Sequence, residues 1–182
     1  MVRLDAHRAL FISTPKAATH TMYQVLPKRY GGVRVGGFHN VAIPRECRDY
    51  WQFSVCRNPY DRLVSSFYSF NRGLPELQQC PHNDDLNLWF RWWIHHSPFY
   101  LLYPQHVRHD NFDIQHFMRC EQLDADFARL PFHTGEPVTL PKVWSREHGT
   151  WQELLDAETI AVANEYYAED FERYGYERVG DA

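Results

Sequence analysis

Residue types that bind anions follow the first apolar segment of the chain. The segment RALFIS, residues 8–13, leads into TPKAATHT, where Lys16 lies among three threonines and a histidine. The first N–H groups of a helix lack partners within the helix and lie at the positive end of its dipole, so anions bind there. Lysine adds a positive charge, and hydroxyls add hydrogen-bond donors. The stretch predicts a phosphate-binding strand–helix turn, or an ordinary turn in which Thr19 only caps the helix.

A second junction of the same kind follows the segment WQFSVCR, residues 51–57. Arg57 ends that segment, and its planar guanidinium suits phosphate oxygens. Ser65 lies about two turns into the next helix and reaches the same anion only if a phosphate lies against the first turns. Arg62, in the same helix, is expected only to pair with a carboxylate at the surface. Two anion sites at two strand ends predict a ligand with two separated phosphate groups.

Short apolar segments alternate with amphipathic ones along the chain. Strands are expected at 8–13, within 31–40, at 51–57 and at 112–123. Helices are expected from residue 19 to near Pro27, and at 58–70, 84–96, 124–130 and 158–176, the last with a stop at Gly175. This order predicts one domain over residues 1–182, an α/β fold with a central, mostly parallel sheet flanked by helices. Such sheets bind ligands beyond the carboxyl ends of their strands, where both junctions lie.

Apolar residues at helical spacing predict which helix faces are buried. The residues expected on these faces are Tyr60, Leu63, Val64, Phe67, Leu86, Trp89, Phe90, Trp93, Ile160, Ala163, Tyr167, Phe171 and Tyr174. Trp92 lies off this face and is a candidate to contact an acceptor molecule. Cys56 and Cys120 lie in apolar, strand-like runs and are expected to be buried thiols.

The composition limits the class of protein. The chain has 182 residues, of which 44% are hydrophobic. Its net charge of −4 argues against nucleic-acid binding. No run of about 18 apolar residues occurs, so no membrane span is expected, and the first apolar patch is interpreted as a strand and not as a signal peptide. The four cysteines form no CxxC pair and the histidines no HExxH motif, so we expect no metal site and a reducing, cytoplasmic location.

Taken together, PKAATHT and RNPYDRLVSSF resemble the two nucleotide-binding motifs of sulfotransferases that use 3′-phosphoadenosine-5′-phosphosulfate (PAPS). FMRCEQLDADF and YYAEDFERYGY resemble later segments of that family, so the similarity spans roughly residues 10–176. The carbohydrate-type, Golgi-like branch is the most similar. The resemblance implies a three-layer, P-loop-like fold. It also implies transfer of a sulfuryl group from PAPS to an acceptor hydroxyl, without a metal, leaving 3′-phosphoadenosine-5′-phosphate (PAP).

The resemblance also implies roles for individual residues. The 5′-phosphosulfate would be bound by Pro15, Lys16, Ala17, Ala18, Thr19, His20 and Thr21. Arg57 and Ser65 would bind the 3′-phosphate, and Lys16 would meet the charge that develops on the leaving oxygen. Lys142, Ser145 and Arg146 lie in the segment PKVWSREHGTW, which either folds over the nucleotide, as in the family, or is a solvated loop. His20 stands where the family more often has threonine or serine.

Sulfuryl transfer also needs a base that accepts the proton of the acceptor hydroxyl. His39, in GGFHN, follows the expected second strand and corresponds to a histidine base of several carbohydrate-type relatives. Glu46 is the second candidate, because some relatives use a glutamate, and His20 is the third.

The sequence does not identify the acceptor, and a sugar hydroxyl is the leading candidate. Two other functions also fit the sequence. A P-loop-type nucleotide or small-molecule kinase would share the fold. However, the GxxxxGK[ST] order is absent, and no carboxylate suited to Mg²⁺ is evident after a strand.

A non-catalytic module that binds PAP is the other alternative. Ala18, which stands where family loops usually carry glycine or a small residue before the hydroxyl pair, and His20 are departures that would fit it.

Overall fold

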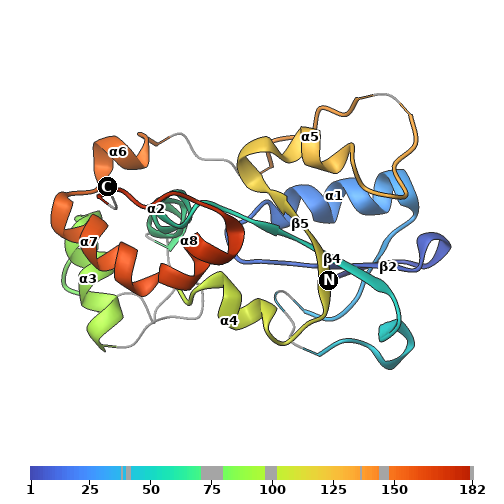
Figure 1. The fold of residues 1–182 in the computed structure, drawn as a ribbon, viewed down its shortest axis with the longest axis horizontal. Coiled ribbons are helices and arrows are strands. Elements are labelled where there is room, and N and C mark those ends of the chain that lie inside the picture. Colours follow the sequence, from blue (N-terminus) through green and yellow to red (C-terminus); the bar gives the residue numbers. More distant parts are fainter. Residues whose placement is uncertain are drawn as a thin grey trace. The chain divides into compact units, whose positions relative to one another are not determined.

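The computed structural model of the chain describes residues 1–37, 39, 42–70, 80–96, 102–135, 137–143 and 148–180. The chain divides into two compact units. One, called the sheet unit below, comprises Met1–Arg57 and Arg108–Ser145; the other, the helical unit, comprises Asn58–Val107 and Arg146–Ala182. Figure 1 labels the elements of both units. The single domain expected from the sequence stays a prediction.

The sheet unit contains a mixed sheet of five strands among the described residues, in the order β3-β1-β2-β4-β5. The strands are β1 (Val2–Leu4), β2 (Ala9–Ile12), β3 (Val33–Arg34), β4 (Trp51–Cys56) and β5 (Ile114–Arg119). Neighbours β2, β4 and β5 are parallel, which confirms the predicted α/β class with a parallel centre. Strand β1 was not expected, and it runs antiparallel to both β2 and β3. Consequently β3 points the same way as β2, and the carboxyl ends of β2, β3, β4 and β5 share one edge.

Apolar side chains cover both faces of the sheet, which explains why all four residues of β2 are buried. Figure 1 shows α1 (Thr19–Tyr30) and α5 (Leu123–Phe127) on one side of β2, β4 and β5. The core on that side contains Phe11, Met22, Leu26, Phe53, Val55, Met118 and Phe127. The core on the opposite face contains Met1, Leu10, Ile12 and Cys47, with four loop residues and Ile114 of β5 packed against it.

Helix α1 does not stop near Pro27, and that expectation was wrong. The helix continues to Tyr30, with Pro27 inside it. Proline removes one helical hydrogen bond at a cost of about 3 kcal/mol. Met22, Val25 and Leu26 are all buried against the sheet, and burial of such side chains yields about 1.5–3 kcal/mol each, enough to outweigh that cost. The helix ends instead at Gly31, whose φ of 62° is left-handed and whose N–H donates to the carbonyl of Leu26.

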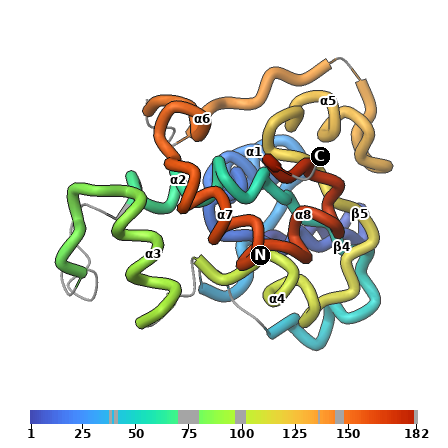
Figure 2. Tube along the Cα trace, turned by 60° about the vertical axis from the view of Figure 1, so that its left-hand side comes forward, coloured from blue at the N-terminus to red at the C-terminus, as the bar shows by residue number. Residues whose placement is uncertain are grey.

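The helical unit is built from α2 (Pro59–Phe70), α3 (Leu86–His96), α6 (Trp151–Leu154), α7 (Ala157–Tyr166) and α8 (Ala168–Tyr174). Helix α4 (Gln105–His109) begins in this unit and ends in the sheet unit. Figure 2 shows α2, α3 and α7 side by side. The expected apolar faces form one core, except that Tyr174 is buried outside it and Ile160 is partly exposed. The long helix expected at 158–176 is two helices, because the chain leaves helical geometry at Tyr167 (φ −104°, ψ 21°) and turns into α8.

Two charged side chains lie inside the helical unit. Arg62 is 1% exposed, donates to the backbone carbonyl of Tyr103 and lies over the Tyr167 ring at 5.7 Å. The expectation that Arg62 pairs with a carboxylate at the surface was therefore wrong. Asp170 is 0% exposed and accepts hydrogen bonds from the backbone N–H groups of Gln105 (2.7 Å) and His106 (2.9 Å). It thereby satisfies the first N–H groups of α4.

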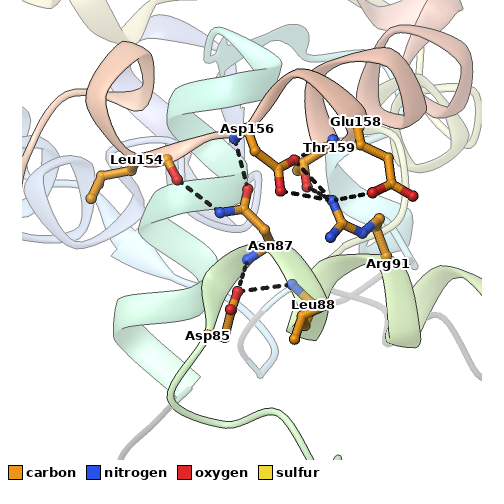
Figure 3. A network of polar contacts seen from close by, with 8 residues as sticks. All are labelled: Asp85, Asn87, Leu88, Arg91, Leu154, Asp156, Glu158 and Thr159. Carbon is orange, nitrogen blue, oxygen red and sulfur yellow. Dashed lines mark hydrogen bonds and ion pairs between the residues drawn. The ribbon is translucent and has the colours of Figure 1, made fainter.

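A polar network joins α3 to α7 (Figure 3). Asp156 is the N-cap of α7 and accepts from the Thr159 N–H at 2.7 Å. Arg91 donates to both carboxylate oxygens of Asp156 (2.8 and 3.0 Å) and to the Thr159 hydroxyl (2.7 Å). Asn87 receives the Asp156 N–H at 3.0 Å and donates to the Leu154 carbonyl at 3.0 Å.

We expect Asp156→Ala to destabilise the protein by about 1–2 kcal/mol, because it removes both a helix cap and the partner of Arg91. Glu158→Ala is the matched control: Glu158 contacts the same guanidinium at 3.4 Å, but its side chain is 74% exposed and is not the helix cap. Urea unfolding followed by circular dichroism measures both changes. Equal losses in the two variants would contradict the assigned cap.

Candidate functional site

The turn after β2 is held in an unusual backbone conformation. Lys16 (φ 64°) and Ala18 (φ 50°) both lie in the left-handed region, which costs a non-glycine residue about 1–2 kcal/mol. The Ala17 N–H donates to the Thr14 carbonyl at 3.2 Å, and the Thr19 hydroxyl donates to the same carbonyl at 2.7 Å. Helix α1 begins immediately afterwards, so the N–H groups of its first turn face the carboxyl edge of the sheet.

Left-handed backbone marks the predicted site. Among the described residues, the non-glycine positions with positive φ are Arg8, Lys16, Ala18 and His39. Three of these were selected from the sequence as site residues, whereas Arg8 closes the turn between β1 and β2. Strained backbone concentrates at binding and catalytic sites, where surrounding contacts hold it in place.

Arg57 braces this turn from the neighbouring parallel strand. It follows β4, and its Nη1 donates to the Lys16 carbonyl at 3.1 Å. The two junctions selected from the sequence therefore meet at one edge of the sheet. Ser65 is half-buried in α2, in the helical unit, and its reach to this edge stays a prediction.

The remaining nucleotide-binding candidates are placed as follows. Pro15, Ala17, Thr19 and Thr21 are buried, Lys16 and Ala18 are half-buried, and His20 is exposed. The Thr21 hydroxyl donates to the Pro141 carbonyl at 3.0 Å, so the loop that carries Lys142 passes the first turn of α1. Lys142 is exposed at that point, whereas Ser145 and Arg146 lie outside the described residues.

His39 lies at the same edge and is held there by Arg108. The Arg108 guanidinium donates from Nε to the Ser13 carbonyl (2.7 Å) and from Nη1 to the His39 carbonyl (2.8 Å). Burial, and then the positive charge of Arg108, lower the pKa of His39 to about 4, against the opposing effect of a hydrogen bond with the Ser13 backbone. The imidazole is therefore neutral at pH 7 and able to accept a proton.

The two other base candidates have different surroundings. Glu46 forms an ion pair with Arg3 (3.3 Å), and its side chain is 60% exposed. His20 lies in the first turn of α1 and is largely exposed; partial desolvation of its imidazole, and then the nearby charges of Lys16 and Arg34, lower its pKa. Geometry thus favours His39, which a guanidinium from another element ties to the end of β2.

Sequence reasoning missed a buried polar cluster beneath the turn. The hydroxyl of Thr14 lies 2.7 Å from Nε2 of His109 and 2.9 Å from the hydroxyl of Ser54. Ser54 also donates to the Ile12 carbonyl at 2.8 Å. The serine within the apolar run WQFSVCR was a usable signal, because a polar side chain in a buried strand requires a partner. His109 offered no such signal, since its partners lie far away in the sequence.

The cysteines and Trp92, which the sequence also singled out, have the following surroundings. All four cysteines are free; Cys47, Cys56 and Cys80 are buried, and Cys120, which was expected to be buried, is partly exposed. Trp92 is half-buried in the helical unit, and its ring stacks on His96 at 4.5 Å. In the part of the chain that the structure describes, no group of three His, Cys, Asp or Glu residues could hold a metal ion. No helix there is long and apolar enough to cross a membrane.

Comparison with known proteins adds no relative: no family model, curated protein or solved structure matches this chain.

The lowered pKa of His39 predicts an acid-sensitive fold. Unfolding restores the ordinary pKa of about 6.5, so the unfolded chain binds more protons than the folded one between pH 6.5 and about 4. The free energy of unfolding therefore falls as the pH falls through this window. His39 alone accounts for a loss of about 2 kcal/mol at pH 4.5. Other groups also titrate there, so the parent is compared with His39→Gln by urea unfolding at pH 7 and pH 4.5.

The variant should lose less stability than the parent over this interval. The exposed His95 provides the control, because His95→Gln should lose as much as the parent. Equal acid sensitivity in the parent and in His39→Gln would contradict a buried, neutral His39.

Proposed function

We propose that this protein is a sulfotransferase that moves a sulfuryl group from PAPS to an acceptor hydroxyl, with a carbohydrate as the first acceptor class to test. The contact between Arg57 and the Lys16 carbonyl (3.1 Å) carries the proposal. It joins the two segments whose sequences resemble the nucleotide-binding motifs of this family. A three-layer, P-loop-like fold is part of the same proposal, and the parallel strands β2, β4 and β5 support it.

The residues at this edge fit a nucleotide with two anionic ends. The first turn of α1 offers backbone N–H groups, and Lys16 is the cation beside it. Arg57 offers a second cation at the end of the next strand. Ser65 and Lys142 would complete the contacts, as would Ser145 and Arg146.

Each proposed role follows from the chemistry of transfer. The acceptor oxygen forms a bond to sulfur while the bond between sulfur and the bridging oxygen of the 5′-phosphate breaks. His39 takes the acceptor proton on its imidazole, because a neutral ring has a free electron pair. Lys16 stabilises the negative charge left on the phosphate oxygen, and PAP is the product. The balance of atoms and charge requires no redox partner.

PAP should bind without added metal, and the affinity should depend on Arg57. Arg57→Ala is expected to weaken binding by about 2–4 kcal/mol, the loss of a charge-assisted contact to phosphate. Arg45→Ala is the control, because Arg45 is an exposed arginine of the same unit and no part of the proposed site. Calorimetric titration with PAP in the presence of a chelator measures both. A larger thermal shift with ATP and Mg²⁺ than with PAP would favour a kinase instead.

Substitutions of Lys16 and His39 should separate binding from chemistry. His39→Ala should bind PAP nearly as well as the parent but lose about a hundredfold or more in turnover, the scale of a lost general base. Lys16→Ala should lose turnover and PAP affinity together, because the cation also contacts the ground-state phosphate. In the parent, kcat/KM should fall only as the pH approaches the His39 pKa of about 4.

Single-turnover transfer of labelled sulfate from PAPS, with Glu46→Ala and His20→Ala alongside, provides the measurement. A His39→Ala variant with parental rates, beside an inactive Glu46→Ala or His20→Ala, would show that the base is misassigned. A parent that binds PAP but transfers no sulfate to any acceptor would indicate a binding module.

A further inference from the structure

Two consecutive residues at the end of α4 contact the root of the turn after β2. His109 lies 2.7 Å from the Thr14 hydroxyl, and Arg108 donates to the Ser13 carbonyl at 2.7 Å. The second branch of the Arg108 guanidinium donates to the His39 carbonyl at 2.8 Å. A single side chain therefore joins the strand that precedes the phosphate-binding turn to the loop that carries the proposed base.

The chemistry of arginine suits this position. Its donors point in fixed directions, so one planar group can hold two carbonyls in a defined relation, whereas a lysine ammonium offers no such fork. Arg108 is half-buried and packs over the Phe112 ring at 5.6 Å, which restricts its movement. Its charge is also the largest electrostatic influence on His39 after burial itself.

We propose that Arg108 is a positioning residue of this site, which fixes the His39 loop against the end of β2 and places a permanent positive charge beside the imidazole. The charge disfavours the imidazolium form, so the ring stays deprotonated at neutral pH and is at the same time a weaker base. The fork holds the His39 backbone, through its carbonyl, against the end of β2. Only the effect of Arg108 on turnover rests on the proposed function; its contacts and its electrostatic effect on His39 are independent of it.

Other charged groups also act on His39. The amino group of Met1 and the imidazole of His20 oppose its protonation, each less than Arg108 does. Arg34 lies over the Tyr23 ring at 4.4 Å, and its charge acts on His20 and on the Met1 amino group. Arg34 is therefore a useful comparison, because it is a cation of the same unit whose guanidinium lies over the Tyr23 ring.

The test is an NMR titration of the His39 imidazole, with its signals assigned by their loss in His39→Gln. In the parent, the pKa should lie near 4. Arg108→Gln should raise it by about one unit, the scale of removing a neighbouring like charge. Arg108→Lys should keep it close to the parental value, and Arg34→Gln should leave it unchanged. A parental pKa near 6.5, or no change in Arg108→Gln, would overturn the proposal.

The turnover of the same variants tests the positioning role. Arg108→Lys should lower kcat about tenfold with KM little changed, because charge is kept and the fixed geometry is lost. Arg108→Gln should also move the acidic limb of the rate profile upward with the His39 pKa. If Arg108→Gln does not fold, the kcat of Arg108→Lys and the titration of the parent still test the proposal. An unchanged kcat in Arg108→Lys would overturn the positioning role of Arg108. A parent without sulfate transfer would refute the proposed function alone, since the titration would still report on Arg108.

Discussion

The backbone of the turn after β2 is the feature on which the rest of the site depends. Lys16 and Ala18 adopt left-handed conformations, which together cost about 2–4 kcal/mol. Three contacts oppose this cost: the Thr19 hydroxyl and the Ala17 N–H on the Thr14 carbonyl, and the Arg57 guanidinium on the Lys16 carbonyl. A neutral hydrogen bond contributes about 1 kcal/mol and one to a charged group about 1.5–3 kcal/mol. The cost of the left-handed conformations and the contribution of these hydrogen bonds are of similar size, so the turn persists because the hydrogen bonds are present.

The sheet supplies these contacts because its parallel strands end at one edge. Strands β2 and β4 are neighbours, with Ile12 opposite Ser54. The residues that follow them, on the turn and at Arg57, are brought within hydrogen-bonding distance by that register. The buried cluster of Thr14, Ser54 and His109 lies just below and fixes the root of the turn from a third element. The turn after β2 is thus supported from β4 and from α4, and not by its own sequence alone.

The features that the sequence determined are local. The run of four apolar residues in β2, the start of α1 at Thr19, the end of β4 before Arg57 and the buried faces of α2 and α3 were all predictable. Each depends on periodicity or on turn chemistry within a few residues along the chain. The choice of Lys16, Ala18 and His39 as site residues also came from the sequence, and left-handed backbone at all three is consistent with that choice.

The tertiary structure alone decided the rest. Pro27 lies inside α1 because the buried side chains around it outweigh one lost hydrogen bond, and Arg62 is buried because a carbonyl and a ring from distant segments enclose it. The bonds of Arg108 to Ser13 and His39 span 95 and 69 positions in the sequence. Likewise, the pKa of His39 depends on burial and on that arginine. Desolvation and contacts between distant segments exist only in the folded chain, so no local pattern of residue types can report them.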